Sequence, residues 1–255
     1  MKLEEKEARK KYGIVAEHYH NWRTKLNPYG WHYNELLEMP ATLSLLGNIK
    51  GKKILDFGCG TGIYAKLLTK KGAKVKGFDL SPEMLTIAKR ENPTLDLRLG
   101  SGYNIPFNEK FDIVIASLVL DYFKNWDIVF QQVNRVLNKN GIFIFSVGNP
   151  VAECTIKKRI KGEKQRVLGI NSYFKEGKIY GTWHKIFYKG KMIDVQMPSY
   201  HKTYETIIKT ITNNKFEIID YKDCFPLIKS KKLFPEEYEF TSKIPYFCVW
   251  KIKKR

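Results

Sequence analysis

The residues best placed to hold a ligand form a glycine-rich segment, DFGCGTG at positions 56–62, which follows a short apolar run. Glycines at 58, 60 and 62 let the backbone turn tightly and approach a ligand, because no Cβ stands in the way. A dinucleotide-binding fingerprint would need Gly or Ala at position 63, where the chain has Ile63. The carboxylate of Asp56 beside the loop disfavours a pyrophosphate and favours a ligand that carries an ammonium or sulfonium charge.

A second carboxylate, Asp79, ends the next apolar run and lies 19 residues beyond Gly60. Open α/β folds place an acid at about this distance, where it accepts hydrogen bonds from ribose hydroxyls. An alternative interpretation makes both Asp56 and Asp79 structural, as helix caps or as acceptors that hold a loop. The two carboxylates and the glycine loop together favour a nucleoside ligand with a cationic group.

The elements that must position these residues alternate regularly between positions 51 and 150. Short apolar runs, typical of strands buried on both faces, lie at Lys53–Phe57, Lys74–Phe78, Leu95–Leu99, Phe111–Ser117 and Gly141–Val147. Amphipathic, helix-like segments lie between them at Ile63–Lys71, Pro82–Glu91 and Asp127–Leu137. This order predicts a parallel sheet covered by helices, with Ser81 as the N-cap of the second helix.

Four sections follow from the pattern. Residues 1–50 are expected to form a helical cap and residues 51–150 a ligand-binding core. Residues 151–202, first basic and then aromatic, are expected to form an insertion of short strands over one end of the sheet. Residues 203–255 are expected to complete the core sheet, with a helix at Tyr204–Asn213 and strands at Phe216–Asp220 and Tyr246–Ile252.

Composition excludes several classes of protein. The 255 residues are 43% hydrophobic and 28% charged, as in soluble globular proteins, and no stretch approaches the roughly 20 apolar residues of a membrane span. The first 13 residues, MKLEEKEARKKYG, lack the apolar centre of a secretory signal. The four cysteines are widely spaced without a CxxC pair, so neither a disulfide framework nor a metal site is predicted. We expect a soluble, cytoplasmic protein.

The net charge of +19 could favour nucleic acid or another anionic partner. Only eight of the 45 basic residues are arginine, however, and arginine is the side chain whose planar fork matches a phosphate. Lysine is spread along the whole chain, which favours a solvated basic surface. Nucleic-acid binding stays the alternative, and a basic run at residues 157–166 is its best support.

Five segments, in this order, resemble the class I S-adenosylmethionine-dependent methyltransferases. They are LDFGCGTG, GFDLSPEMLTIAK, a loop ending in IPF, FDIVIASLVLDYF and RVLNKNGIFIFSV, all within residues 51–148. More narrowly, they are similar to a small-molecule group related to the ubiquinone and menaquinone methyltransferases. The resemblance implies S-adenosylmethionine as cofactor. It also implies a Rossmann-like α/β fold: a mostly parallel seven-stranded sheet with helices on both faces, an N-terminal helical lid and an insertion after the fifth strand.

The resemblance also implies which residues hold the cofactor. The glycine loop would pass under its methionine portion, Asp56 would lie near its amino group, and Asp79 would hold the ribose hydroxyls. Ser101 stands where the family often has an aspartate that accepts from the adenine amine, and its hydroxyl carries no charge. The implied cofactor-binding residues are Tyr19, Asp56, Gly58, Cys59, Gly60, Gly62, Asp79, Leu80, Met84, Ser101, Gly102 and Ser117. Tyr19 could instead be a core aromatic on a helix.

A general base is needed only when the methyl acceptor is protonated at the working pH. The preferred candidates are His201, Asp121 and His184, in that order, and His18 and His20 are further ones. Asp121 follows the fourth strand, at the carboxyl end of the sheet where open α/β folds bind ligands. A structural or surface role remains the alternative for each histidine.

Aromatic residues could line the pocket for the methyl acceptor, which favours a small, planar and largely apolar molecule. The candidates are Tyr122, Tyr173, Phe174, Trp183 and Tyr200, most of them in the insertion, and they could equally form its core. Two other functions stay open. One is an RNA- or tRNA-modifying methyltransferase, and the other is a protein that binds the cofactor without catalysis. A nicotinamide dehydrogenase is the weakest alternative because of Ile63.

Overall fold

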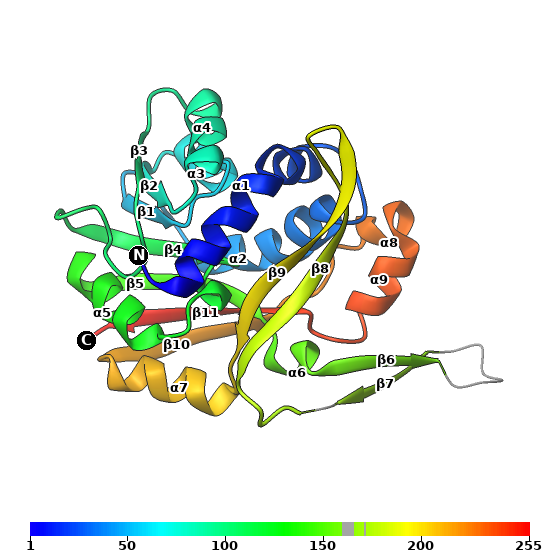
Figure 1. Cartoon of the computed structure of the whole chain (residues 1–255). Coiled ribbons are helices and arrows are strands. Elements are labelled where there is room, and N and C mark those ends of the chain that lie inside the picture. Colours follow the sequence, from blue (N-terminus) through cyan, green and yellow to red (C-terminus); the bar gives the residue numbers. More distant parts are fainter. Residues whose placement is uncertain (160–165, 171) are drawn as a thin grey trace.

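The central element is a seven-stranded sheet in the order β3-β2-β1-β4-β5-β11-β10 (Figure 1). The computed structural model describes residues 1–159, 166–170 and 172–255, except for the side chains between 156 and 170. The strands are β1 Lys53–Phe57, β2 Lys74–Asp79, β3 Asp96–Leu99, β4 Phe111–Ser117, β5 Leu137–Gly148, β10 Phe216–Asp223 and β11 Phe247–Lys254. The first five are parallel, and β11 runs antiparallel to both of its neighbours. The predicted fold class is thereby confirmed.

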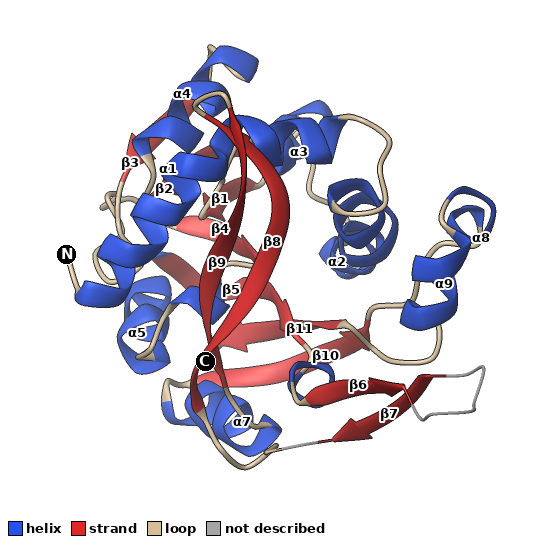
Figure 2. Cartoon of the chain, turned by 45° about the vertical axis from the view of Figure 1, so that its right-hand side comes forward, coloured by secondary structure: helices blue, strands red, loops and turns tan. Residues whose placement is uncertain are grey.

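Apolar residues alternate between the two faces of the sheet, and each face is covered by helices (Figure 2). Leu55 packs into the core under α5 (Trp126–Val136) and α7 (Tyr204–Asn213), whereas its neighbour Ile54 packs into the core on the opposite face. That second core contains residues of α2 (Met39–Leu46) and α3 (Ile63–Lys70). Burial on both faces is what the continuous apolar runs predicted.

The N-terminal helix α1 (Leu3–Thr24) lies between α4 (Pro82–Glu91) and a long hairpin formed by β8 (Gly177–Tyr188) and β9 (Lys191–His201) (Figure 1). A separate apolar cluster joins the three, with Val15 and Ala16 from the helix, Met84 and Ile87 from α4, and Ile186, Val195 and Met197 from the hairpin. Distant parts of the chain therefore form one cover over the sheet.

The insertion also contains a short helix, α6 (Pro150–Glu153), and a second hairpin formed by β6 (Thr155–Arg159) and β7 (Arg166–Ile170). The basic run predicted at residues 157–166 falls on this hairpin, where 160–165 and the neighbouring side chains lie outside the described residues.

Several element boundaries differ from the sequence-based expectation. The fifth strand begins at Leu137, directly after α5, because Leu137 already pairs with Phe111 of β4. The helical pattern before residue 46 is split into a π-helix, η1 (Trp31–Glu38), and α2. Glu38 ends the π-helix as a buried carboxylate that accepts from Tyr64 and Ser146 hydroxyls. Two short helices, α8 (Lys229–Leu233) and α9 (Pro235–Thr241), were not predicted.

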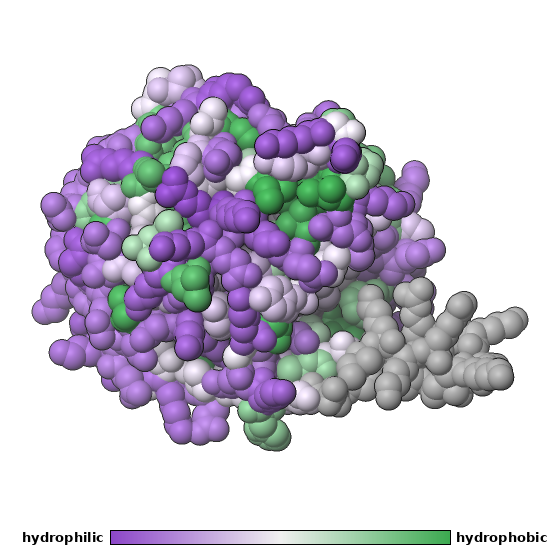
Figure 3. Space-filling model, viewed as in Figure 1, coloured by the Kyte–Doolittle hydropathy of each residue, from purple (hydrophilic) through white to green (hydrophobic). Residues whose placement is uncertain are grey.

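The surface over the hairpin is largely hydrophilic, with separate apolar groups between charged side chains (Figure 3). In the part of the chain that the structure describes, no helix is long and apolar enough to cross a membrane. The same described residues contain no group of three or more His, Cys, Asp or Glu side chains arranged to hold a metal ion.

Candidate cofactor and acceptor site

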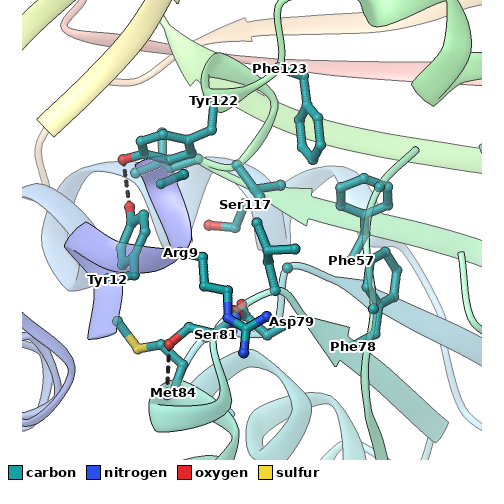
Figure 4. Close-up of a pocket in the computed structure, with 18 of the residues that line it drawn as sticks. Arg9, Tyr12, Phe57, Phe78, Asp79, Ser81, Met84, Ser117, Tyr122 and Phe123 are labelled. Atoms are coloured by element: carbon teal, nitrogen blue, oxygen red, sulfur yellow. Dashed lines mark hydrogen bonds between the residues drawn. The ribbon is translucent and has the colours of Figure 1, made fainter. Parts of the chain in front are cut away.

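A cavity opens at the carboxyl ends of β1, β2 and β4, under α1 (Figure 4). It contains about 670 Å³ of empty space, including the part open to solvent. Among the residues predicted to bind cofactor or acceptor, those that line it are Tyr19, Gly58, Gly60, Asp79, Leu80, Met84, Gly102, Ser117 and Tyr122. The structure therefore brings most of the predicted cofactor residues to one place.

The backbone of the glycine loop forms part of the cavity wall, at Gly58 and Gly60. Gly58 and Gly60 have φ values of +69° and +52°, in the left-handed region that favours glycine. A Cβ on Gly58 would lie 2.5 Å from a methyl carbon of Val119, so that position is closed by packing. A Cβ on Gly60 would meet only Tyr19, at 4.0 Å, and would take up space in the cavity. Gly60 is therefore the position where a ligand can approach the main chain.

Asp79, at the end of β2, holds the glycine loop and faces the cavity. Its Oδ2 accepts from the Gly60 N–H at 2.8 Å, and its Oδ1 accepts from the Ser81 N–H at 2.9 Å. Burial raises the pKa of Asp79, while these backbone donors oppose the rise. Each carboxylate oxygen has a further lone pair, so ribose hydroxyls could still donate to it. The structural and ligand-binding interpretations of Asp79 are therefore compatible.

Unpartnered polar atoms gather at the other side of the loop. Asp56 is only 2% exposed and its Oδ2 has no hydrogen-bond partner among the described residues, and the same is true of the buried Thr61 hydroxyl. Arg23, also buried, donates from Nε to Glu35 at 2.7 Å and from Nη1 to the Tyr19 hydroxyl at 2.9 Å, but its Nη2 lacks a partner in the described chain. Buried polar atoms left in this state are costly, which suggests a ligand that satisfies them.

The charges of these groups define what such a ligand would carry. Burial, and next the charge of Asp79, raise the pKa of Asp56 to about 7, and the Arg23 guanidinium opposes that rise. A free carboxylate oxygen suits an ammonium group and a free guanidinium N–H suits a carboxylate. The pair therefore fits the amino-acid end of S-adenosylmethionine. Arg23 was not predicted from the sequence, although Arg23 follows Tyr19 by four residues and therefore lies on the same helix face.

Apolar side chains line another part of the cavity, as a purine requires. Leu80 and the buried Met84 line it together with phenylalanine rings (Figure 4). A Cβ on Gly102 would lie 2.4 Å from the Phe57 ring and 2.5 Å from the Phe123 ring, so only glycine fits there. This geometry supports the predicted places of Leu80, Met84 and Gly102 beside the adenine.

Four predicted cofactor residues do not line this cavity, and one of them is the buried Asp56 described above. Ser101 lies instead in an adjacent hollow, which is described further below. Cys59 packs into a small cluster with Leu85 and Leu97, and its backbone N–H donates to Phe78 O at 2.9 Å. Gly62 precedes α3, where a Cβ would lie 2.4 Å from the Asn92 side chain. Cys59 and Gly62 therefore hold the conformation of the glycine loop through contacts outside the cavity.

Aromatic side chains close the cavity where α1 meets the loop after β4. The hydroxyls of Tyr12 and Tyr122 lie 2.5 Å apart and point toward one another (Figure 4). Trp183 of β8 stacks on Tyr19, with ring centroids 5.7 Å apart, and meets Tyr12 edge-on. Burial raises the pKa of both Tyr12 and Tyr122 well above that of a free phenol, so both hydroxyls are protonated near neutral pH.

A strained residue directs the chain into this region. Leu118 follows β4 with a φ of +50°, a value that non-glycine residues rarely adopt. Its N–H donates to Ser146 of β5, which holds the turn in place. The following residues form the short 3₁₀ helix η2 (Leu120–Tyr122), so the strained turn brings Val119 and Tyr122 to the cavity wall.

His201 has no free ring nitrogen. Its Nδ1 lies 2.8 Å from Glu153 Oε2 and its Nε2 lies 2.8 Å from the carbonyl oxygen of Tyr173, and its side chain is buried. The hydrogen bond to Glu153 raises the pKa of His201, although burial opposes the rise. Whether the shared proton is on His201 or on Glu153, both nitrogens are engaged, so His201 joins two segments of the insertion and does not line the cavity.

The other candidate bases also lie outside the cavity. Asp121 is partly buried, accepts from the Gly148 N–H at 2.9 Å, and has a raised pKa because of desolvation and the nearby Glu153. The His184 side chain is 66% exposed and contacts Asp194 at 2.9 Å. His18 packs on the Trp22 ring and His20 lies 3.9 Å from Glu91. Among the described residues that line the cavity there is no histidine.

The five predicted acceptor-pocket aromatics are divided between two regions. Tyr122 lines the cavity and Trp183 packs directly behind Tyr12 and Tyr19. The Tyr173 hydroxyl accepts from the Tyr204 N–H at the base of the insertion, and Phe174 is 87% exposed. Tyr200 lies under the Lys202 ammonium. The prediction of an aromatic acceptor wall rests on Tyr122 and Trp183, with Tyr12 and Tyr19 as further members.

Comparison with known proteins agrees with this site. A family model described as a methyltransferase domain matches residues 55–145. An uncharacterized protein of Haemophilus influenzae is 31% identical over 236 residues, which cover 87% of this chain and 88% of that protein. A ubiquinone biosynthesis O-methyltransferase of Pelagibacter ubique is 25% identical over 178 residues, 68% of each chain.

A solved structure adds the three-dimensional comparison. A crystal structure from Listeria monocytogenes, provisionally assigned as an S-adenosylmethionine-dependent methyltransferase, superposes with a TM-score of 0.70. It is 30% identical, and the match covers 86% of this chain and 96% of that one. This chain belongs to the class I S-adenosylmethionine-dependent methyltransferases. It is an enzyme of that class, with S-adenosylmethionine as its methyl donor.

The raised pKa of Asp56 predicts a pH-dependent affinity for the demethylated cofactor, S-adenosylhomocysteine. The ligand's ammonium group prefers the ionised carboxylate, whose population grows as pH rises through about 7. We expect the association constant to increase about tenfold between pH 6 and pH 8, as one linked proton requires. Calorimetry at several pH values measures this, and D56N, which cannot ionise, should flatten the profile. If the association constant of D56N changes with pH as steeply as that of the wild type, another group is responsible for the pH dependence.

Arg23→Met should weaken binding of S-adenosylhomocysteine about ten- to hundred-fold, because a charge-assisted hydrogen bond to the ligand carboxylate is lost. The control ligand is 5′-methylthioadenosine, which lacks the amino-acid group and should keep its affinity within about twofold if the interaction is with that group alone. Calorimetry with both ligands distinguishes a direct contact between Arg23 and the ligand carboxylate from an indirect effect on α1. Equal losses for both would mean that Arg23 only holds α1 in place through Glu35.

Proposed function

We propose that this enzyme methylates a small, planar acceptor that binds against the aromatic wall formed by Tyr12, Tyr19, Tyr122 and Trp183. The observation that carries the proposal is the position of this wall. Tyr12, Tyr19 and Tyr122 line the same cavity as the glycine loop, next to the polar atoms that suit the amino-acid end of the cofactor. Flat rings and tyrosine hydroxyls favour a ligand that is mainly apolar and carries a few polar atoms.

S-adenosylmethionine supplies a methyl group that its sulfonium already activates, so the chain's own task is to align the acceptor and exclude water. The Trp183 ring stacks over Tyr19 and so covers the cavity from the hairpin side. Tyr12 can donate its proton to Tyr122, which leaves the Tyr122 hydroxyl hydrogen free for an acceptor oxygen. We infer that Tyr122 positions the acceptor in this way.

The chemistry of the acceptor follows from what the cavity contains. Its one carboxylate, Asp79, already accepts two backbone N–H groups, and no histidine lines it within the described chain. An acceptor that arrives with an available lone pair needs no protein base. We propose a phenol or enol acidic enough to be ionised at working pH, or an unprotonated nitrogen. The ubiquinone biosynthesis relative, named for O-methylation, is consistent with the oxygen alternative.

Transfer of a labelled methyl group tests this proposal. The protein is incubated with methyl-labelled S-adenosylmethionine and, in parallel, with a small-metabolite extract and with total RNA. We expect label in the small-metabolite reaction and none above background in the RNA. Label confined to the RNA would overturn the proposal in favour of an RNA-modifying enzyme, the function that the net charge of +19 first suggested. A separate measurement of RNA affinity at increasing salt identifies electrostatic binding without transfer.

Tyr122→Phe should lower kcat/KM for the acceptor about three- to tenfold, since one neutral hydrogen bond is lost while the ring stays. Affinity for S-adenosylhomocysteine should not change, which calorimetry measures separately. The matched control is Tyr180→Phe, because Tyr180 lies on the exposed side of the same hairpin that carries Trp183. If Y122F keeps the wild-type kcat/KM, the Tyr122 hydroxyl does not position the acceptor.

A further inference from the structure

A buried carboxylate from α1 lies next to the adenine end of the cavity. Glu5, in the first turn of the helix, is only 2% exposed. Its Oε2 accepts from the Lys2 backbone N–H at 3.0 Å, and its Oε1 accepts from the Ser101 hydroxyl. In the part of the chain that the structure describes, no lysine or arginine lies within ion-pair distance of it. Glu5 is therefore a buried acceptor held by two neutral donors, with lone pairs to spare.

The contacts of Ser101 give it a supporting role in this arrangement. Its hydroxyl has one hydrogen, which it donates to Glu5, while its oxygen accepts from the Tyr103 N–H at 3.0 Å. A ligand amine that approaches this corner meets, in Glu5, a charged acceptor with greater capacity than the serine oxygen. The acceptor expected at Ser101 from sequence is thus supplied by a residue 96 positions earlier in the chain.

The hollow that Glu5 lines adjoins the cofactor cavity. Glu5 and Ser101 share the hollow with Leu80, Gly100 and Arg9, and these last three also line the cavity. Leu80 belongs to the apolar part of the cavity wall, and Gly100 lines the same cavity. A purine that packs on these residues would border the hollow, where Glu5 is the carboxylate among the described lining residues.

We propose that Glu5 recognises the exocyclic amine of the adenine ring, and that Ser101 positions Glu5 for this contact. The amine has two hydrogens to donate and the carboxylate accepts them, whereas the carbonyl oxygen of a hypoxanthine ring would repel it. Glu5 therefore determines specificity for an adenosyl cofactor. It also ties the first turn of α1 to the nucleoside, so that the same helix contacts the cofactor at both ends, through Glu5 and through Arg23.

The test compares two ligands that differ at this corner of the purine: S-adenosylhomocysteine, whose C6 carries the amine, and S-inosylhomocysteine, whose C6 carries a carbonyl oxygen and whose N1 carries a hydrogen. Binding is measured by calorimetry for the wild-type protein, E5Q and E5M. The wild type should prefer the adenosyl ligand, and E5Q should reduce that preference at least tenfold, because the glutamine amide can donate to the carbonyl oxygen. E5M should reduce it as well, by removing both the attraction and the repulsion.

The matched control is Glu4→Gln. Glu4 is in the same helical turn but accepts from the Tyr103 hydroxyl and does not line the hollow, so its substitution should leave the preference unchanged. A preference that stays at the wild-type value in E5Q and E5M would overturn the proposal. An equal loss of affinity for both ligands would also overturn the proposal, because that result assigns Glu5 a purely structural role.

Discussion

The position of α1 across the carboxyl ends of the strands is the constraint on which the site depends. The sheet and its loops alone would offer glycine backbone, Asp56 and Asp79, but one side of the cavity would be open. The helix supplies that side with Tyr12 and Tyr19, the second bonded to Arg23, and it is held there by apolar packing against α4 and the β8–β9 hairpin. Polar contacts from its first turns, such as Glu7 with Lys178 at 2.6 Å, fix its rotation.

What could be predicted from sequence was mainly local. The glycine loop, Asp79 at the end of its strand and the Ser81 cap each depend on neighbours a few residues away, so their types and spacing carry the information. The strand runs were equally clear, because a strand buried on both faces needs apolar residues throughout. These features place the cofactor on the fold without knowledge of the rest of the chain.

What could not be predicted depends on partners that are distant in sequence. His201 was favoured as a base because histidine titrates near neutral pH, but spacing does not reveal that Glu153 and the Tyr173 carbonyl occupy both its nitrogens. Arg23 and Glu5 are two charged residues among many in a basic, charged helix, and only the folded arrangement shows that they are buried. The π-helix and the helices at 229–241 likewise follow from tertiary packing, as the buried His32 shows by bonding both Ser230 and Thr241.

The link between Glu153 and His201 has an evolutionary consequence. These two residues stand at the start and at the end of the insertion, and they join at its base, 48 positions apart in the chain. The segment between them is thus closed at its base, and the β8–β9 hairpin within it also packs against α1. The pairing of β5 with β11 lies outside this segment, so its register does not depend on the length of the segment. A change of acceptor range within this segment has to keep the face of the hairpin that packs against α1, because the same helix also serves the donor site.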